Sequence, residues 1–243
     1  MPTPADERLA RHREEWESKP LLRELYGEWF EMISSRMGPG LTVEIGSGPS
    51  RFAEYRRGVI ATDIVAVPWI DLVMDAARIP LRDNSVGNLV MLDVFHHIEN
   101  PGNFLDEAER VLSPGGRVIM VEPYVSPLSY LVYNFIHEEA VNMKADPFAP
   151  AEPSGRSLPF DGNGALPTLT FWRRADRFKE RWPSLEISRK ELFSFILYPL
   201  SGGYGFPGLI PRGCVPLVRR VEKSLRPFAR MLSFRTLVVL EKI

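Results

Sequence analysis

The chain has 243 residues, long enough to bury a full hydrophobic core without help from metals or disulfides. Apolar residues make up 44% and charged residues 25%, values typical of a globular protein rather than a disordered or membrane-embedded one. The 30 Lys and Arg residues nearly balance the 31 Asp and Glu residues. The resulting formal charge of −1 removes the general electrostatic attraction that a duplex-binding protein needs.

Cysteine content and hydropathy also limit the class of protein. Cys214 is the single cysteine, so the sequence excludes an internal disulfide and a zinc site built from cysteines. The first residues are charged where a signal peptide needs an apolar core. The longest oily stretch, residues 128–136, is far shorter than the roughly 20 residues that cross a bilayer. We therefore expect a cytoplasmic protein, and nothing in the sequence indicates its oligomeric state.

The chain begins with a predicted helical segment over residues 1–38. Glutamates alternate with Leu, Trp and Phe at helical spacing through residue 36, and Gly38-Pro39-Gly40 ends the pattern. Short β-branched runs and helical stretches follow. Strands are predicted at 41–45, 58–62, 71–74, 86–92 and 117–121, with an amphipathic helix at 101–112. Such interleaving predicts a doubly wound, Rossmann-like α/β fold with a mainly parallel sheet.

Beyond Pro123 the alternation of strands and helices breaks down. Residues 124–185 are rich in Pro, Gly and aromatic residues and are predicted to form a lid-like insertion, with a helix at 128–140, inside one domain of 243 residues. Strands are predicted to resume at 186–198 and 236–240. Between them, a basic amphipathic helix is predicted at 216–232.

The ends of the first three predicted strands carry the residues that point to chemistry. Gly46 and Gly48 follow the first strand, where glycine lets a ligand approach the backbone closely. Asp63 ends the second strand, at the position where a carboxylate accepts the hydroxyls of a ribose. Asp75-Ala76 ends the third and is suited to contact an adenine edge. Together they predict a site for an adenine nucleoside at the carboxyl ends of the strands.

Residues 83–120, DNSVGNLVMLDVFHHIENPGNFLDEAERVLSPGGRVIM, resemble class I S-adenosylmethionine-dependent methyltransferases. The similarity extends from Leu41 to about Glu122 and is greatest to the branch that contains the ubiquinone and menaquinone biosynthesis methyltransferases. This resemblance implies S-adenosylmethionine as cofactor. It also implies methyl transfer to an oxygen or a carbon of a small-molecule or lipid-like acceptor.

The resemblance assigns cofactor-binding roles to matching positions. The methionine half would contact Glu44, Gly46, Ser47 and Gly48; the ribose and adenine would contact Asp63, Ile64, Asp75 and Ala76; the amino group would meet the backbone at Leu92 and Asp93. The sequence differs from the pattern of this family at two places that affect how the turns pack. Pro49 replaces the usual third small residue, with a shortened helix after it, and VAVPWIDLV leaves almost no room for the usual second helix.

His96 and His97 are the candidate catalytic residues, because they directly follow the fourth strand and histidine titrates near neutral pH. Acceptors that must lose a proton need such a base. One of the pair can instead face away and only pack the following turn. Tyr26 also has two interpretations, as a core residue or as part of a helix that covers the cofactor.

Several alternatives can be weighed from the sequence. A short-chain dehydrogenase needs Tyr-x-x-x-Lys, which is absent, and a base-methylating enzyme carries Asp/Asn-Pro-Pro-aromatic where this chain has DVFH at residues 93–96. We therefore expect no nucleic-acid partner. Glu122 is expected to form hydrogen bonds, and His137-Glu138-Glu139 lacks the H-E-x-x-H spacing, so no metal is expected.

Two questions stay open at this stage. A non-catalytic protein that binds S-adenosylmethionine, or an interaction protein that retains the fold, is the alternative to an enzyme. The basic helix at 216–232 is either a solvated face or a site of weak contact with a membrane surface.

Overall fold

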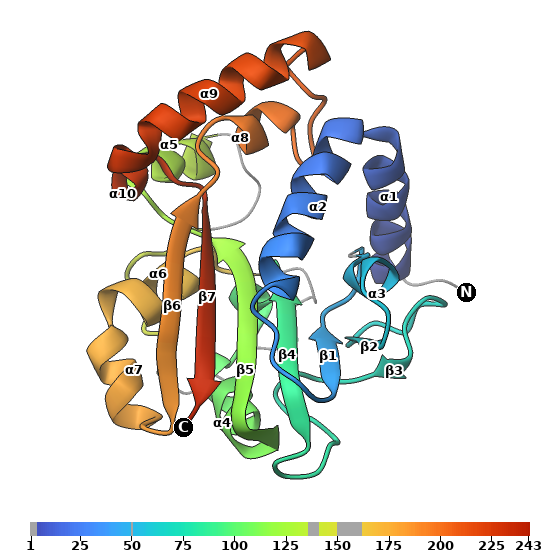
Figure 1. Cartoon of the computed structure of the whole chain (residues 1–243), viewed down its shortest axis with the longest axis vertical. Helices are drawn as coiled ribbons and strands as arrows, with labels where there is room; N and C mark the ends of the chain where they lie inside the picture. Colours follow the sequence, from blue (N-terminus) through green and yellow to red (C-terminus); the bar gives the residue numbers. More distant parts are fainter. Residues whose placement is uncertain (1–3, 50, 136–140, 150–161) are drawn as a thin grey trace.

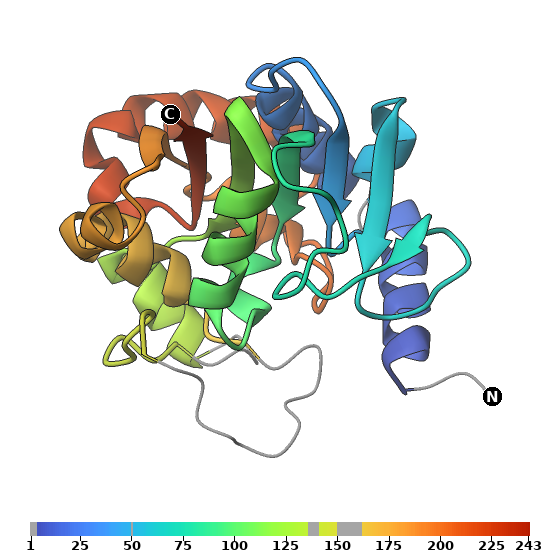
Figure 2. The ribbon, with the colours of Figure 1, turned by 90° about the horizontal axis from the view of Figure 1, so that it is seen from below.

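A computed structural model describes residues 4–49, 51–135, 141–149 and 162–243 (Figure 1). Its centre is a seven-stranded sheet with the strand order β3-β2-β1-β4-β5-β7-β6. Helices lie on both faces of this sheet (Figures 1 and 2). The predicted doubly wound α/β fold is confirmed.

All strands except β7 run in the same direction. The strands are β1 (Thr42–Ile45), β2 (Val59–Asp63), β3 (Leu72–Val73), β4 (Val86–Leu92), β5 (Leu112–Pro123), β6 (Leu185–Phe193) and β7 (Arg235–Lys242). Each pair among β3, β2, β1, β4 and β5 is parallel, whereas β7 is antiparallel to both β5 and β6. The strand order reverses between β1 and β4, and in such sheets ligands bind outside the carboxyl ends at this point.

Helices account for most of the remaining described chain. They are α1 (Pro4–Ser18), α2 (Pro20–Ser34), α3 (Phe52–Tyr55), α4 (Pro101–Val111), α5 (Pro127–Phe135), α6 (Leu166–Thr168), α7 (Ala175–Arg181), α8 (Leu197–Ser201), α9 (Val215–Leu225) and α10 (Ala229–Leu232). Short η elements are η1 (Phe95–His97), η2 (Leu169–Arg173), η3 (Arg212–Cys214) and η4 (Arg226–Phe228). No helix in these ranges is long and apolar enough to cross a membrane.

Alternating side chains of the central strands divide the core into two layers. Val118 and Met120 of β5 pack with α4 and α7 on one face, through Phe104 and Phe178. The intervening residues of β5 pack with α2 on the other face. This period-two alternation is what a strand covered on both sides produces. The two layers hold the carboxyl ends of β1, β4 and β5 at one edge of the sheet.

Proline explains two boundaries that the sequence pattern missed. The predicted helix over 1–36 is two helices, because Pro20 starts α2 and the residue before a proline is disfavoured in helical geometry. Lys19 accordingly has φ −109° and ψ 88°. The predicted basic helix at 216–232 is likewise interrupted, and Pro227 lies in the short η4 that separates α9 from α10.

One further prediction, the strand at 186–198, was wrong in its bounds, and the helix predicted at 128–140 is described only in part. The strand predicted at 186–198 ends at Phe193, since Ser194 has a left-handed φ of 63°. Tyr198 therefore lies in α8. The helix predicted at 128–140 is described as Pro127–Phe135, and residues 136–140 lie outside the described chain. Within 124–185, α7 packs on the sheet through Phe178 and Trp182.

Candidate functional site

The turn after β1 is tight and depends on glycine. Gly46 has a left-handed φ of 68°, and a Cβ there would lie 2.5 Å from a methyl group of Val94. The amide of Ser47 donates to the carbonyl of Thr62 at 2.8 Å, which joins this turn to the end of β2. The Ser47 hydroxyl is buried and has no hydrogen-bond partner among the described residues. This buried hydroxyl is a polar group that a ligand could satisfy.

Asp63 lies at the end of β2, directly beside that turn. Its Oδ2 accepts from the amide of Gly48 and its Oδ1 from the amide of Val65, both at 2.8 Å. Burial raises the pKa of the Asp63 carboxyl, and the backbone hydrogen bonds offset part of this effect. A carboxylate has about four lone-pair directions, so two amides leave acceptor capacity for hydroxyl groups.

Two other side chains support the turn. Glu44 is buried at the end of β1 and its Oε2 accepts from the amide of Ala53 at 3.3 Å, at the start of α3. The indole Nε1 of Trp69 donates to the carbonyl of Gly48 at 2.7 Å. The role of Trp69 was not predicted, although a lone tryptophan in the short connection after β2 was a visible signal.

Helix α1 covers this part of the site. A Cβ on Gly48 would lie 3.0 Å from Leu9, which is 2% exposed. The Arg13 guanidinium lies 4.5 Å from the ring centroid of Trp69. The sequence pattern left open whether the N-terminal helical segment covers the cofactor site, and here Leu9 of α1 lies against the glycine turn. Helix α1 therefore lies over the glycine turn beside Asp63.

The predicted adenine contacts are more exposed. Ile64 follows Asp63 and is 56% exposed. Asp75 is exposed after β3, and its Oδ1 accepts from the amide of Ala77 at 2.8 Å. Ala76 is partly buried against the sheet core. These residues lie beside β2 because Met74 donates its amide to the carbonyl of Asp63.

The end of β4 has a strained backbone. Leu92 is buried, and Asp93 has a left-handed φ of 58°, which is uncommon for a residue other than glycine. The Asp93 carboxylate is ion-paired with Arg235 of β7 and accepts from the Tyr26 hydroxyl at 3.4 Å. Strain of this kind is common at functional sites. Tyr26 is therefore both a core residue and a partner of a predicted site residue.

Arg235 was missed by the sequence analysis. Its guanidinium is buried, lies 4.3 Å from the ring of Tyr198 and 5.2 Å from the ring of Trp29. Burial alone would lower the pKa of Arg235, but the charge of Asp93 reverses the shift and raises it. The guanidinium is thus a permanent cation, and its position in an alternating apolar strand concealed it from pattern analysis.

Glu122, at the end of β5, holds the segment that follows β4. Its Oε1 accepts from the amides of Val94 at 2.8 Å and Phe95 at 2.7 Å, and its Oε2 lies 2.6 Å from His96 Nδ1. Burial pushes the pKa of Glu122 upward, but His96 and the two amides outweigh it and the net shift is downward. The predicted hydrogen-bonding role of Glu122 agrees with this geometry.

The two histidines lie together at a small pocket. Their ring centroids are 4.0 Å apart, and both line a cavity of about 240 Å³. Ile98, Glu99, Gly162, Asn163 and Leu166 complete its wall. His96 itself is 2% exposed. His137-Glu138-Glu139, the other histidine-containing motif, lies outside the described residues.

One group of side chains has the spacing of a metal site. Ligand atoms of Asp93, His96 and Glu122 all lie within 4.8 Å of one another. The two carboxylates already have partners. Arg235 neutralises Asp93, and the amides of Val94 and Phe95 donate to one oxygen of Glu122. A fixed guanidinium beside the group repels a cation. The arrangement is better described as a hydrogen-bonded charge network.

Comparisons with known proteins agree with the fold. Residues 43–120 match a family model described as a methyltransferase domain. A polyketide synthase of Dictyostelium discoideum is 33% identical over 57 residues, which are 24% of this chain and 2% of that protein. The chain therefore spans a very small part of that relative's length.

Two solved structures cover most of the chain. A SAM-dependent methyltransferase of Thermotoga maritima has a TM-score of 0.55 at 16% identity, with 98% of this chain and 97% of that chain covered. One from Archaeoglobus fulgidus has a TM-score of 0.54 at 14% identity, with 90% and 94% covered. The fold is that of class I methyltransferases.

Proposed function

We propose that this chain is an enzyme that transfers a methyl group from S-adenosylmethionine to an oxygen or a carbon of a small-molecule or lipid-like acceptor. The observation that carries the proposal is the Asp63 carboxylate, which is fixed beside the Gly46–Gly48 turn by two backbone amides. This arrangement lies within the segment that matches the methyltransferase domain. An enzyme of the ubiquinone- and menaquinone-like branch would take such an acceptor.

The residues around Asp63 fit the proposed cofactor. Asp63 retains acceptor capacity for ribose hydroxyls, and the buried Ser47 hydroxyl has a hydrogen bond to offer. Glu44 adds a buried carboxylate at the end of β1. When bound, S-adenosylmethionine supplies a methyl group already activated on a sulfonium. The chain's own residues then have to hold the acceptor in line with that methyl group.

We assign the role of general base to His96, with His97 as the neighbour that completes the pocket wall. Glu122 is ionised at neutral pH because its pKa is lowered, so its carboxylate accepts a hydrogen bond from the Nδ1–H of His96. This bond fixes the neutral tautomer whose Nε2 is an acceptor. A base held in this way can take a proton from a hydroxyl or an acidic carbon. The pocket of about 240 Å³ suits a small acceptor group.

The segment 124–185 is proposed to act as a lid over the acceptor. Its α6 contacts η1, which carries both histidines, and its Asn163 donates its amide to the carbonyl of His96 at 2.8 Å. Leu166 of the same segment lines the pocket. A segment that supplies pocket wall and is attached at its ends can control access to the acceptor.

Calorimetric titration with S-adenosylmethionine tests the cofactor site. Asp63→Ala is expected to weaken binding by about 30-fold or more, since a hydrogen bond to a charged group is worth about 1.5–3 kcal/mol. Glu180→Gln, at an exposed position of α7, is the matched control and is expected to bind normally. Unchanged affinity in Asp63→Ala would show that the ribose assignment is wrong.

Methyl transfer is tested separately with labelled S-adenosylmethionine and a panel of phenols, quinols and acidic carbon compounds. With an accepted compound, His96→Gln is expected to lower kcat by about 10²-fold or more while cofactor affinity stays unchanged. An equal loss in His97→Gln alone would move the base to His97. Cofactor binding without turnover of any acceptor would favour a non-catalytic binding protein.

A further inference from the structure

A second surface, outside the proposed active site, combines exposed apolar and basic side chains. It is formed by α9, η4 and α10, which lie along one end of the molecule in Figure 1. The apolar members are Leu217, Val221, Phe228 and Met231, all of which are exposed, Leu217 by 63%. Positions 217, 221, 224, 228 and 231 follow the three- and four-residue spacing of one helical face. We call this surface the α9–α10 face.

The α9–α10 face is strongly cationic. Its basic members are Arg220, Lys223, Arg226 and Arg230, all exposed. Glu222 is the only acid between Glu191 and Glu241, where the sequence has seven Lys and Arg residues. Glu222 faces inward, since its Oε1 accepts from three backbone amides that precede and begin α8. No acidic side chain of α9, η4 or α10 is therefore turned outward.

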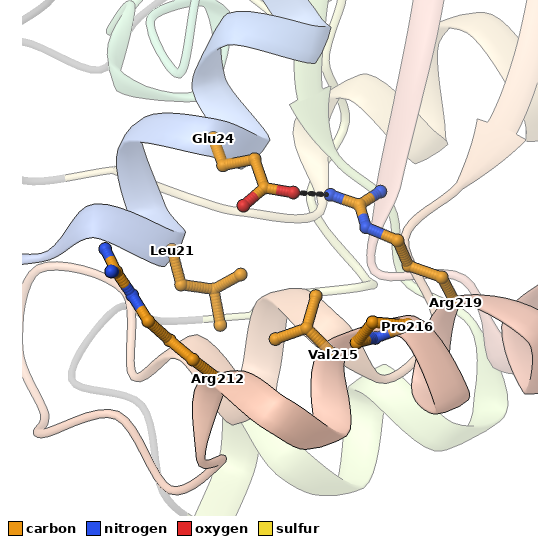
Figure 3. Close-up of a pocket in the computed structure, with 6 residues that line it drawn as sticks. All are labelled: Leu21, Glu24, Arg212, Val215, Pro216 and Arg219. Atoms are coloured by element: carbon orange, nitrogen blue, oxygen red, sulfur yellow. Dashed lines mark hydrogen bonds and ion pairs between the residues drawn. The ribbon is translucent and has the colours of Figure 1, made fainter.

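The opposite side of α9 is occupied by α2. Arg219 forms an ion pair with Glu24 at 2.7 Å (Figure 3). It forms a second ion pair with Glu28 at 2.5 Å. Leu21 and Val215 line the groove of about 560 Å³ between these helices. The cation that faces the protein is thus neutralised within the chain, whereas the four cations of the α9–α10 face have no ion-pair partner among the described residues.

The other basic segment of the chain, residues 173–181, is different. Arg174 and Arg177 both pair with Asp146, and Arg181 donates to the carbonyl of Phe148 and lies over Trp182. These cations serve to hold α7 to neighbouring segments. Unpaired cations interleaved with exposed apolar side chains therefore distinguish the α9–α10 face from an ordinary basic surface.

We propose that the α9–α10 face binds the surface of a lipid bilayer that contains anionic lipids. An amphipathic helix that lies in the headgroup region buries its apolar side chains, while its Lys and Arg residues attract anionic headgroups. The cations alone would also suit a nucleic acid, but contact with phosphates would leave Leu217, Phe228 and Met231 in water. A bilayer satisfies both classes of side chain at once.

The neighbouring helix supports the same partner. α5 packs against α10 and exposes Tyr130, Leu131 and Phe135, the last by 83%. These side chains extend the apolar area next to the α9–α10 face. A folded domain rarely leaves so many large apolar side chains in water at one end unless they contact something.

Flotation with lipid vesicles tests the proposal on the full chain. Wild type is expected to float with vesicles of phosphatidylcholine and phosphatidylglycerol and not with phosphatidylcholine alone. Arg220→Glu/Lys223→Glu is expected to weaken binding by about 30-fold or more, because each cation near an anionic surface contributes about fivefold. Leu217→Ser/Val221→Ser is expected to weaken binding several-fold at the same net charge.

Arg173→Glu/Lys179→Glu is the matched control, since it makes the same change of charge on the other basic segment and is expected to bind vesicles like wild type. Circular dichroism confirms that each variant is folded. The proposal is overturned if wild type fails to float with anionic vesicles or if the control loses binding equally. It is also overturned if the apolar variant binds unchanged, which would indicate a purely electrostatic surface suited to nucleic acid.

Discussion

The two halves of the site hold their acidic side chains by different means. At the end of β2, Asp63 accepts hydrogen bonds from backbone amides of its own turn and of the glycine turn. At the ends of β4 and β5, Asp93 forms an ion pair with Arg235 and Glu122 forms a hydrogen bond with His96, so that each carboxylate is held by a side chain. The first half is held by local backbone and the second by side chains from distant strands.

This difference assigns the two halves different tasks. Backbone amides stabilise the Asp63 carboxylate without neutralising it, so it can still accept hydroxyl groups of a ligand. The pairs around Glu122 are buried and mutually satisfied, which makes them suited to fix His96 in one orientation. The first half is therefore built to bind and the second to position.

The largest loss of unfolding free energy is expected when the Glu122 carboxylate is removed from the second half of the site. Glu122→Ala leaves two backbone amides and His96 without their buried acceptor, and removal of one partner of a buried pair costs about 3–5 kcal/mol. Urea unfolding followed by circular dichroism measures this loss. Glu54→Ala, which breaks exposed pairs with Arg13 and Arg51, is expected to cost about 1 kcal/mol or less. Equal losses in the two variants would contradict a special role for Glu122.

A somewhat smaller effect is expected where the two halves touch. Gly46→Ala adds a Cβ that meets Val94, in a left-handed backbone, and is expected to cost about 2–3 kcal/mol of unfolding free energy. Gly58→Ala is the matched control, because Gly58 also has positive φ but open space around it, and should cost about 1–2 kcal/mol.

The double variant Gly46→Ala/Val94→Ala separates the two causes. Truncation of Val94 removes the methyl groups that the new Cβ would meet, so the pair of changes should cost less than the sum of the single changes. Strictly additive losses would show that backbone strain alone, and not contact between the β1 and β4 turns, makes glycine necessary at position 46.

The two halves also differ in how far they could be predicted from sequence. Asp63 and its partner Gly48 are 15 residues apart, within one strand-turn-strand unit that has a recognisable pattern. β4 has the predicted bounds because it is mostly apolar and buried along its whole length. By contrast, Arg235 is 142 residues from Asp93, and nothing local to either residue indicates that β7 inserts beside β5 in antiparallel orientation.

The position of α1 over the glycine turn also could not be predicted from local sequence patterns. A helix was predicted near the N-terminus, but periodicity alone could not show that it breaks at Pro20 and folds back. That break lets α1 place Leu9 on Gly48. Contacts between segments are set by tertiary packing, which a single sequence does not encode in any short window.

Glu122 and Asp63 are expected to change the free energy of unfolding in opposite directions as pH rises. The folded-state pKa of Glu122 lies below its ordinary value of 4.5, so its contribution to stability is complete above about 4.5 and is lost as pH falls through the folded pKa. Burial raises the pKa of Asp63 above its ordinary value of 3.8. The folded state then holds that proton more tightly, so stability falls as pH rises from 3.8 through the raised pKa.

Unfolding free energies of wild type, Glu122→Gln and Asp63→Asn, measured by urea titration across the acid range, check these signs. The stability advantage of wild type over Glu122→Gln should shrink as pH falls. Relative to wild type, Asp63→Asn should become more stable as pH rises through the Asp63 transition. The same slope in both variants would remove the electrostatic distinction between the two halves.

The smallest expected change in free energy concerns Leu9 of α1, which lies over the glycine turn. Leu9→Ala shortens the buried side chain that lies on Gly48, so it should lower the free energy needed to move α1 away by about 2 kcal/mol. If the closed form competes with the ligand, binding of S-adenosylmethionine should then tighten by up to about 30-fold, with faster association. Calorimetry and stopped-flow fluorescence measure both quantities, and Leu209→Ala at an exposed position is the control. Weaker binding in Leu9→Ala would instead mean that α1 stays in place and Leu9 packs against the bound nucleoside, and α1 would then belong to the binding site.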